Sequence, residues 1–293
     1  MNRIILSFVL ALTGLCACSA QSPRPEGAAD YPLDHVVYTP KDSARVCELL
    51  RMDAGANDVL FFARKFIGLP YVAHTLEVAD PEQLVVNLHG LDCTTYVETV
   101  LALALTYREG SDRFGDYCRN LERLRYRRGV RDGYLSRLHY FAWWMHDNVD
   151  KGIVSEVKDK KHWDAPLTVN DYYMTKNWQQ YRMLKAHPEW VPEITRMEKA
   201  ANGPDGTYLP EKYLNLTKKD LGAIENGDVI AIVTTKAGLD YSHLGFAVWG
   251  KDGKLHLLNA SSVYKKVVED SNTLFKYLGE RKTSIGIRLL RLN

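Results

Sequence analysis

The chain has 293 residues, of which 46% are hydrophobic and 25% charged, and its formal net charge is +2 at pH 7. This length predicts one large domain or two small ones. The near-neutral charge and the absence of a run of lysine and arginine argue against nucleic acid as a partner. One apolar stretch, at the N-terminus, stands out, so we expect the rest of the chain to form a globular protein.

The N-terminus carries the pattern of a secretory signal peptide, with Arg3 followed by an apolar stretch too short to span a bilayer comfortably. Leu15-Cys16-Ala17-Cys18 resembles a bacterial lipobox, which implies a signal peptide over residues 1–17 and a membrane tether through a lipid on Cys18. Cleavage after Ala20 without a lipid is the alternative. We therefore expect an exported protein of a bacterium, either periplasmic or an outer-membrane-anchored lipoprotein.

Residues 18–41 are rich in proline, alanine, glycine and small polar residues, which predicts a flexible linker. The remainder, 42–293, is expected to be a single catalytic domain. From Ser43 apolar residues recur at helical spacing until Gly68-Leu69-Pro70, where a helix must stop. Another helix is predicted after Asp92, whose side chain is suited to cap it.

A polar segment rich in tyrosine and tryptophan, at about 108–222, is interpreted as a substrate-recognition insertion with a helix near 136–146. After this insertion, short apolar runs separated by turn residues predict strands at 228–234, 243–249, 254–260 and 284–290. Helices packed on a later antiparallel sheet, with a large mixed insertion, predict an α+β fold.

Cys93 lies where a glycine-containing loop turns into the helix after Asp92. At such a position the helix dipole and the free N–H groups favour a thiolate, and the Cys93 amide faces a developing oxyanion. The alternative is a cysteine that packs as a small hydrophobe. With Cys47 and Cys118, the folded part of the expected mature chain has three cysteines, so at least one of them is free, and a Cys47–Cys118 disulfide stays open.

A thiol nucleophile needs a base, and the base needs a group that orients it. His243 begins a predicted strand and shares one face with Gly245, so we expect the helix bearing Cys93 to lie against that face. The next strand is its predicted hairpin partner. It offers Asn259 to accept from the distal imidazole N–H, and His256 is the competing candidate.

Four segments resemble, in order and spacing, the motifs of NlpC-type cell-wall cysteine peptidases of the papain-like superfamily. The resemblance implies a papain-like NlpC-type fold with Cys93, His243 and Asn259 as catalytic residues. Thr94 replaces the usual serine, and the usual Trp-Gly-Gly after Tyr71 is missing, so the groove must differ from that of a γ-D-glutamyl-diaminoacid endopeptidase. The segments are Gly68-Leu-Pro-Tyr71-Val, Leu91-Asp-Cys93-Thr, Asn226-Gly-Asp228-Val and His243-Leu-Gly245-Phe-Ala-Val.

Gly133-Tyr-Leu-Ser-Arg137-Leu-His139-Tyr-Phe, His-Gly-Leu-Asp-Cys-Thr-Thr and Leu-Leu-Asn-Ala-Ser-Ser resemble a separate branch of that superfamily. Its members are N-acetylmuramoyl-L-alanine amidases that act on muropeptide fragments, and the resemblance favours small recycled fragments, anhydro forms among them. It implies that Cys93 attacks the lactyl carbonyl of N-acetylmuramic acid and that His243 protonates the departing L-alanine amine.

Three further residues are expected to bind this substrate. Tyr71 is the predicted second oxyanion donor, with ordinary packing as the alternative. Arg137 and His139 are predicted ligands for sugar or for stem-peptide carboxylates, with structural pairing of Arg137 as the alternative. The expected partner is thus a disaccharide-peptide fragment of peptidoglycan, bound by a monomer.

Two other functions stay open on the sequence alone. One is cleavage within the stem peptide by an NlpC-type endopeptidase. The other is a glycan-binding lipoprotein without activity, which has no need of the cysteine, histidine and asparagine set. No His-Glu-x-x-His or comparable ligand spacing occurs, and no cofactor motif, so neither a metal nor a cofactor is expected.

Overall fold

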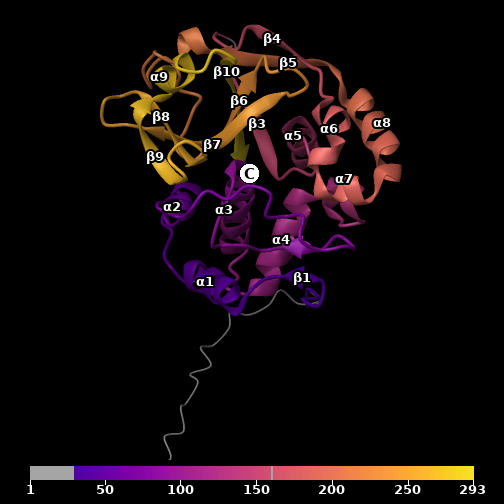
Figure 1. The fold of residues 1–293 in the computed structure, drawn as a ribbon. Coiled ribbons are helices and arrows are strands. Elements are labelled where there is room, and N and C mark those ends of the chain that lie inside the picture. The colour runs from indigo at the N-terminus through magenta and orange to yellow at the C-terminus, as the bar shows by residue number, and fades with distance from the viewer. Residues whose placement is uncertain (1–29, 160) are drawn as a thin grey trace, which may run out of the picture.

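The computed structural model describes residues 30–159 and 161–293 (Figure 1). The expected signal peptide at 1–17 and Cys18 lie outside the described residues. Across the part of the chain that is described, no helix is long and apolar enough to cross a membrane.

The prediction of a flexible linker is wrong for its second part, residues 30–41. Strand β1 (Val36–Val37) pairs in parallel with β2 (Leu84–Val85), and Val36 is buried. Thr39 then starts the first helix through a reciprocal cap with Asp42, in which each side chain accepts from the other residue's backbone N–H. The composition of the segment predicted a linker. Its two adjacent valines form a strand instead, and its capping box starts a helix.

The N-terminal region is helical, as predicted, but its first helical stretch is broken. Gly55 adopts φ 62° in the interruption, and the Asn57 side chain caps the second helix by accepting from Leu60 N–H. The helices of this region are α1 (Pro40–Leu50), α2 (Asp58–Arg64), α3 (Cys93–Arg108) and α4 (Phe114–Arg125).

Within the described residues the main sheet has eight strands in the order β4-β5-β10-β6-β7-β8-β9, with β3 pairing on β10. The α+β class is confirmed, and all four predicted strands are present. Strand β9 was not predicted because its sequence is largely polar and it lies at the edge of the sheet. The C-terminal strands are β6 (Val229–Thr234), β7 (Tyr241–Trp249), β8 (Leu255–Ser261), β9 (Lys266–Thr273) and β10 (Ser284–Leu292).

The insertion at about 108–222 extends this sheet. Its strands join the sheet through β5, which pairs with β10, and through β3, which also pairs with β10. The helix predicted near 136–146 begins later, because Arg137 and Tyr140 have extended backbones. The elements between α4 and β6 are α5 (Phe141–Asp150), β3 (Val154–Val157), β4 (Ala165–Val169), α6 (Tyr173–Lys176), α7 (Arg182–Ala186), α8 (Val191–Ala201) and β5 (Gly203–Pro210).

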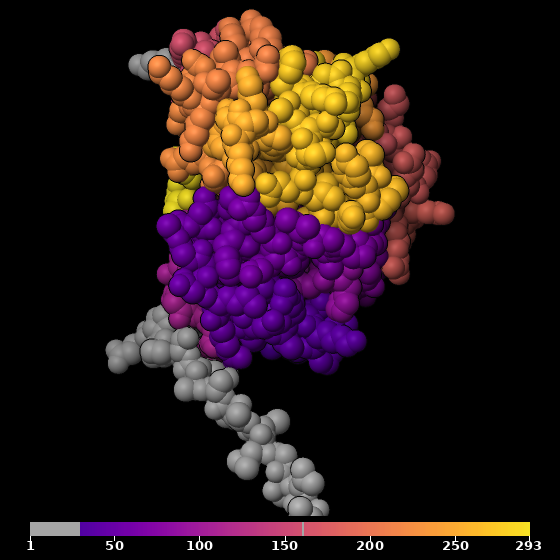
Figure 2. Space-filling model, turned by 90° about the vertical axis from the view of Figure 1, so that its left-hand side faces the viewer, coloured from indigo at the N-terminus to yellow at the C-terminus, as the bar shows by residue number. Residues whose placement is uncertain are grey.

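Helices cover the two faces of the sheet differently. Helix α3 packs on the face that carries Phe246, whose ring meets Tyr96 edge to face at 5.4 Å. The opposite face carries Leu257 and packs against Leu278 of α9 (Leu274–Gly279). Figure 2 shows the N-terminal and C-terminal parts of the chain adjoining along one boundary on the visible side of the molecule.

Candidate active site

Cys93 is the first residue of α3, and Asp92 caps this helix as predicted. The Asp92 carboxylate accepts from Thr95 N–H at 2.8 Å, and the Thr95 hydroxyl accepts from Asp92 N–H at 2.9 Å. This capping box fixes the backbone on both sides of the cysteine. The Cys93 N–H remains among the helix-start donors that have no partner within the helix.

The surroundings of Cys93 favour a neutral thiol. Burial raises the pKa of the Cys93 thiol to about 12, and the Asp92 carboxylate adds to the rise. Hydrogen bonds to the sulfur from Leu244 N–H and from Thr94 act in the opposite direction. Burial therefore outweighs the helix start, contrary to the sequence-based expectation of a thiolate. A thiol of this kind can act as a nucleophile only with a base that takes its proton.

His243 lies near the start of β7 and contacts Asn259 of β8. Its Nε2 is 2.9 Å from Asn259 Oδ1, and the Asn259 side chain is fully buried. The amide oxygen accepts only, so the imidazole proton is on Nε2 and Nδ1 is the basic nitrogen. His256, the competing candidate, instead contacts Asp252 and the Asp270 carbonyl.

Gly245 brings β7 and β8 close enough for this contact. A Cβ on Gly245 would lie 2.7 Å from the Leu258 carbonyl oxygen and 3.0 Å from Asn259 Cβ. The recorded pairing of the two strands runs from Trp249 with Leu255 to Phe246 with Leu258. A bare glycine at the next position thus allows the Asn259 amide to reach the imidazole.

The predicted approach of the cysteine helix to the histidine face is wrong. Helix α3 packs on the opposite face, against Phe246, and α9 covers the side on which His243 and Gly245 lie. Cys93 reaches the end of the sheet where the pairing of β7 and β8 has stopped. There the N–H of Leu244 is available to the Cys93 sulfur.

Two residues beside His243 were not predicted. The Tyr277 ring on α9 lies nearly parallel to the imidazole, with centroids 6.3 Å apart and planes at 22°, and the Arg281 guanidinium lies 3.5 Å from the Tyr277 ring centroid. Burial lowers the pKa of His243, the Asn259 hydrogen bond raises it, and the Arg281 charge lowers it. No motif in the sequence marks this short helix; only the register of the sheet brings it here.

Tyr71 is held beside the cysteine loop by its backbone. It forms a parallel bridge with Leu91, and its N–H donates to the Lys265 carbonyl at 2.9 Å. Burial raises the pKa of Tyr71 to about 12, and the Cys93 and Asp92 charges add to the rise. Tyr71 therefore lies near Cys93, and His243 contacts Asn259.

Arg137 and His139 lie in a different network. Arg137 is buried, its Nε is 3.1 Å from a Glu82 carboxylate oxygen, and it stacks over Tyr134 at 4.8 Å. His139 Nε2 contacts the Tyr134 carbonyl oxygen at 2.9 Å, and burial followed by the Arg137 charge lowers its pKa well below the ordinary value. In the described part of the chain, neither residue forms a hydrogen bond, ion pair or ring contact with Cys93 or His243.

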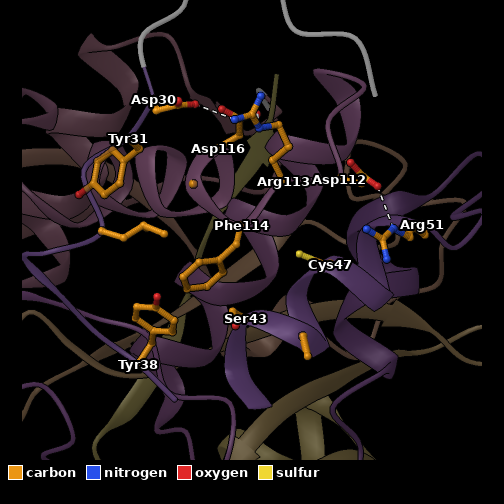
Figure 3. A pocket seen from close by; sticks show the side chains of 13 residues that line it. Asp30, Tyr31, Tyr38, Ser43, Cys47, Arg51, Asp112, Arg113, Phe114 and Asp116 are labelled. Carbon is orange, nitrogen blue, oxygen red and sulfur yellow. Dashed lines mark hydrogen bonds and ion pairs between the residues drawn. The ribbon is translucent and has the colours of Figure 1, made fainter. Parts of the chain in front are cut away.

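Two cavities lie away from this group. One, of about 470 Å³, is formed by residues 30–38, α1 and the start of α4, with Tyr38, Phe114 and Cys47 along it (Figure 3). The other, of about 620 Å³, lies between α5 and α8. The cysteines of the described residues are all free, so the Cys47–Cys118 disulfide left open by the sequence does not form. Within those residues no three metal-binding side chains cluster.

An imidazole that an amide orients, on the strand whose Leu244 N–H faces the Cys93 sulfur, can serve a thiol that transfers acyl groups through a thioester. A family model described as AmiA-like, N-acetylmuramoyl-L-alanine amidase-like, matches residues 61–287. The chain therefore belongs to this amidase-like family. No curated protein matches it.

Solved structures agree with this fold. An N-acetylmuramoyl-L-alanine amidase from Bacteroides uniformis is 38% identical, covers 82% of this chain and 100% of its own, and has a TM-score of 0.75. A Bacteroides fragilis protein named as a candidate xylanase is 42% identical, with coverages of 80% and 100% and a TM-score of 0.74. A Legionella pneumophila protein at 24% identity shares the fold, with coverages of 86% and 94% and a TM-score of 0.66.

Proposed function

We propose that this protein is a cysteine-dependent N-acetylmuramoyl-L-alanine amidase that cleaves the amide between the muramic acid lactyl group and L-alanine in peptidoglycan fragments. Cys93 is the nucleophile, His243 the acid and base, and Asn259 the residue that orients His243, in a papain-like, NlpC-type arrangement. The observation that carries the proposal is the His243–Asn259 hydrogen bond at the end of the sheet where Cys93 begins α3. Membership of the amidase-like family supports the choice of bond.

The reaction begins with proton transfer. His243 Nδ1 takes the Cys93 thiol proton while the sulfur attacks the lactyl carbonyl carbon. The carbonyl oxygen becomes an oxyanion that the Cys93 N–H and the Tyr71 hydroxyl stabilise. The C–N bond then breaks, and His243 returns the proton to the leaving L-alanine nitrogen. Water, deprotonated by His243, hydrolyses the remaining thioester and releases the sugar acid and the free thiol.

The electrostatics suit this order of events. Burial lowers the pKa of His243, so the imidazole is neutral and basic at neutral pH, and burial raises the pKa of Cys93, so the thiol keeps its proton until attack. Because the Cys93 thiol and the His243 imidazole are both neutral at rest, no ion pair has to be buried in the desolvated site. Charge develops only as the substrate carbonyl becomes an oxyanion, where the helix start stabilises it.

Mass spectrometry of the products tests the proposal. The protein is incubated with a defined disaccharide-tetrapeptide in its intact, reduced and 1,6-anhydro forms. Release of intact disaccharide and intact tetrapeptide supports the amidase, and the form cleaved fastest identifies the preferred sugar. Release of the disaccharide with L-Ala-D-Glu still attached indicates an endopeptidase instead.

A Cys93→Ala variant separates catalysis from binding. It should bind the fragment and leave it uncleaved, because no thioester forms without the thiol. Cleavage by this variant at the wild-type rate refutes the mechanism. A folded wild-type protein that cleaves no fragment favours the glycan-binding alternative.

We further propose export of this chain as a periplasmic or outer-membrane-anchored lipoprotein, acting as a monomer. The support is the signal-peptide pattern and the resemblance of Leu15-Cys16-Ala17-Cys18 to a lipobox. Fractionation of cells fed a labelled fatty acid tests the tether: label should appear on the wild type and not on a Cys18→Ser variant. Light scattering of the purified protein measures its oligomeric state.

A further inference from the structure

His243, Tyr277 and Arg281 form a stack at the active site. The imidazole and the phenol lie nearly parallel at 6.3 Å, and the guanidinium lies 3.5 Å from the phenol centroid. Tyr277 is buried and is held by α9, and Arg281 donates through Nη1 to the Tyr277 carbonyl. The cation therefore has a fixed position on the side of the imidazole covered by α9.

This cation lacks a carboxylate partner in the described part of the chain. Two other arginines that reach the sheet are paired: Arg64 of α2 with Glu269 of β9, and Arg291 of β10 with Asp228. Arg281 is partly exposed, and one of its five N–H groups is used by the Tyr277 carbonyl. The remaining donors form a planar fork that matches a carboxylate.

The proposed substrate carries such a carboxylate at a suitable place. Its stem peptide continues from L-alanine to D-glutamate, which is linked onward through its γ-carboxyl group and so keeps a free α-carboxylate. An extended chain advances about 3.5 Å per residue, so this group lies roughly two residues from the attacked carbonyl. The stack covers a comparable distance, with 6.3 Å between the His243 and Tyr277 ring centroids and 3.5 Å from the Tyr277 centroid to the Arg281 guanidinium.

We infer that Arg281 is a specificity residue that binds the free α-carboxylate of the second stem-peptide residue, with Tyr277 holding the guanidinium in place. This inference rests on the proposed amidase function and adds to it a requirement for an acidic second residue. It assigns the recognition of the peptide to α9 and to the residue two positions after it.

Binding of the carboxylate also changes the base. The titratable or charged groups around the imidazole are Asp92 and Cys93 at the start of α3, and Tyr277 and Arg281 beside α9. Arg281 lowers the pKa of His243 in the free protein. A bound carboxylate offsets that charge, so the His243 pKa is higher in the complex than in the free enzyme.

The test compares two disaccharide-tetrapeptides that differ only in a free or an amidated α-carboxyl on D-glutamate. We expect wild-type kcat/KM to be about tenfold higher for the free acid, as for a charge-assisted hydrogen-bonded pair at a partly exposed site. Arg281→Gln should remove this preference. The neighbouring exposed Lys282→Gln is the matched control and should keep it. With the free-acid substrate, the acid limb of the kcat profile should lie at higher pH than the acid limb of the kcat/KM profile, because kcat reports the His243 pKa in the complex and kcat/KM the His243 pKa in the free enzyme.

Each outcome is decisive. A preference that survives in Arg281→Gln, or equal wild-type rates on both substrates, overturns the role of Arg281 while the amidase function stands. Failure of the wild type to cleave either substrate overturns the proposed function itself. If Arg281→Gln does not fold, Arg281→Lys decides the question, because it keeps a cation yet loses the planar fork and should show a reduced preference.

Discussion

Replacing Gly245 with alanine should damage the site without touching any reacting group. The new Cβ would lie 2.7 Å from the Leu258 carbonyl oxygen and 3.0 Å from Asn259 Cβ, so β8 must move away from β7. Overpacking of this kind costs about 1–3 kcal/mol of unfolding free energy. The same displacement lengthens the 2.9 Å contact between His243 and Asn259. Because that contact fixes the tautomer of the base, we expect kcat to fall about a hundredfold.

Urea unfolding followed by circular dichroism measures the first effect, and hydrolysis of a defined muropeptide measures the second. Gly115→Ala is the control. Gly115 lies in helix α4, and a Cβ there would be 3.6 Å from Tyr31 Cβ, an ordinary van der Waals contact. It should leave activity unchanged and stabilise the helix slightly. The reasoning is refuted if Gly245→Ala unfolds at the wild-type urea concentration and turns over at the wild-type rate.

Three further predictions concern single charges and hydrogen bonds. Asn259→Ala should lower kcat and move the acid limb of the pH–rate profile to lower pH, because the hydrogen bond that raises the His243 pKa is lost; a limb that moves to higher pH contradicts this. Glu82→Ala should destabilise the fold by about 3–5 kcal/mol in urea titration, because buried Arg137 loses its partner, and an unchanged midpoint would favour a ligand role for Arg137. Burial, together with the Asp240 charge, raises the pKa of Asp171 above its unfolded value, so the unfolding free energy should fall as pH rises from about 4 towards the folded pKa. Asp171→Asn should flatten that slope between pH 4 and the alkaline range, as thermal melts at several pH values will show.

The sequence predicted the parts of the site that local rules control. Asp92 and Cys93 are marked by the start of an amphipathic helix, and capping is a short-range effect. His243 and Asn259 lie on strands whose alternation and turn define a hairpin, so their shared face follows from the period of two. The resemblance to cell-wall hydrolases named Cys93, His243 and Asn259 as one set, and the hydrogen bond between His243 and Asn259 is the contact within that set which the structure shows.

The rest depends on packing between distant segments. Which face of the sheet α3 covers is decided by the contact of Tyr96 with Phe246, and nothing near Cys93 in the sequence encodes that choice. Tyr277 and Arg281 reach His243 only because α9 packs on β8, β9 and β10. Arg137 has the residue type of a ligand, but its burial against Glu82 was not visible before the loops were placed.

The pairing of β10 has a consequence for how the protein is made. This strand (Ser284–Leu292) joins β3, β5 and β6, all of which precede it in the chain. The sheet therefore closes only after residue 292 has left the ribosome, and until then the insertion strands have no partner at the centre. The strands of the insertion can therefore join the sheet only through a finished β10, whereas β6, β7, β8 and β9 pair with one another in chain order and do not depend on it.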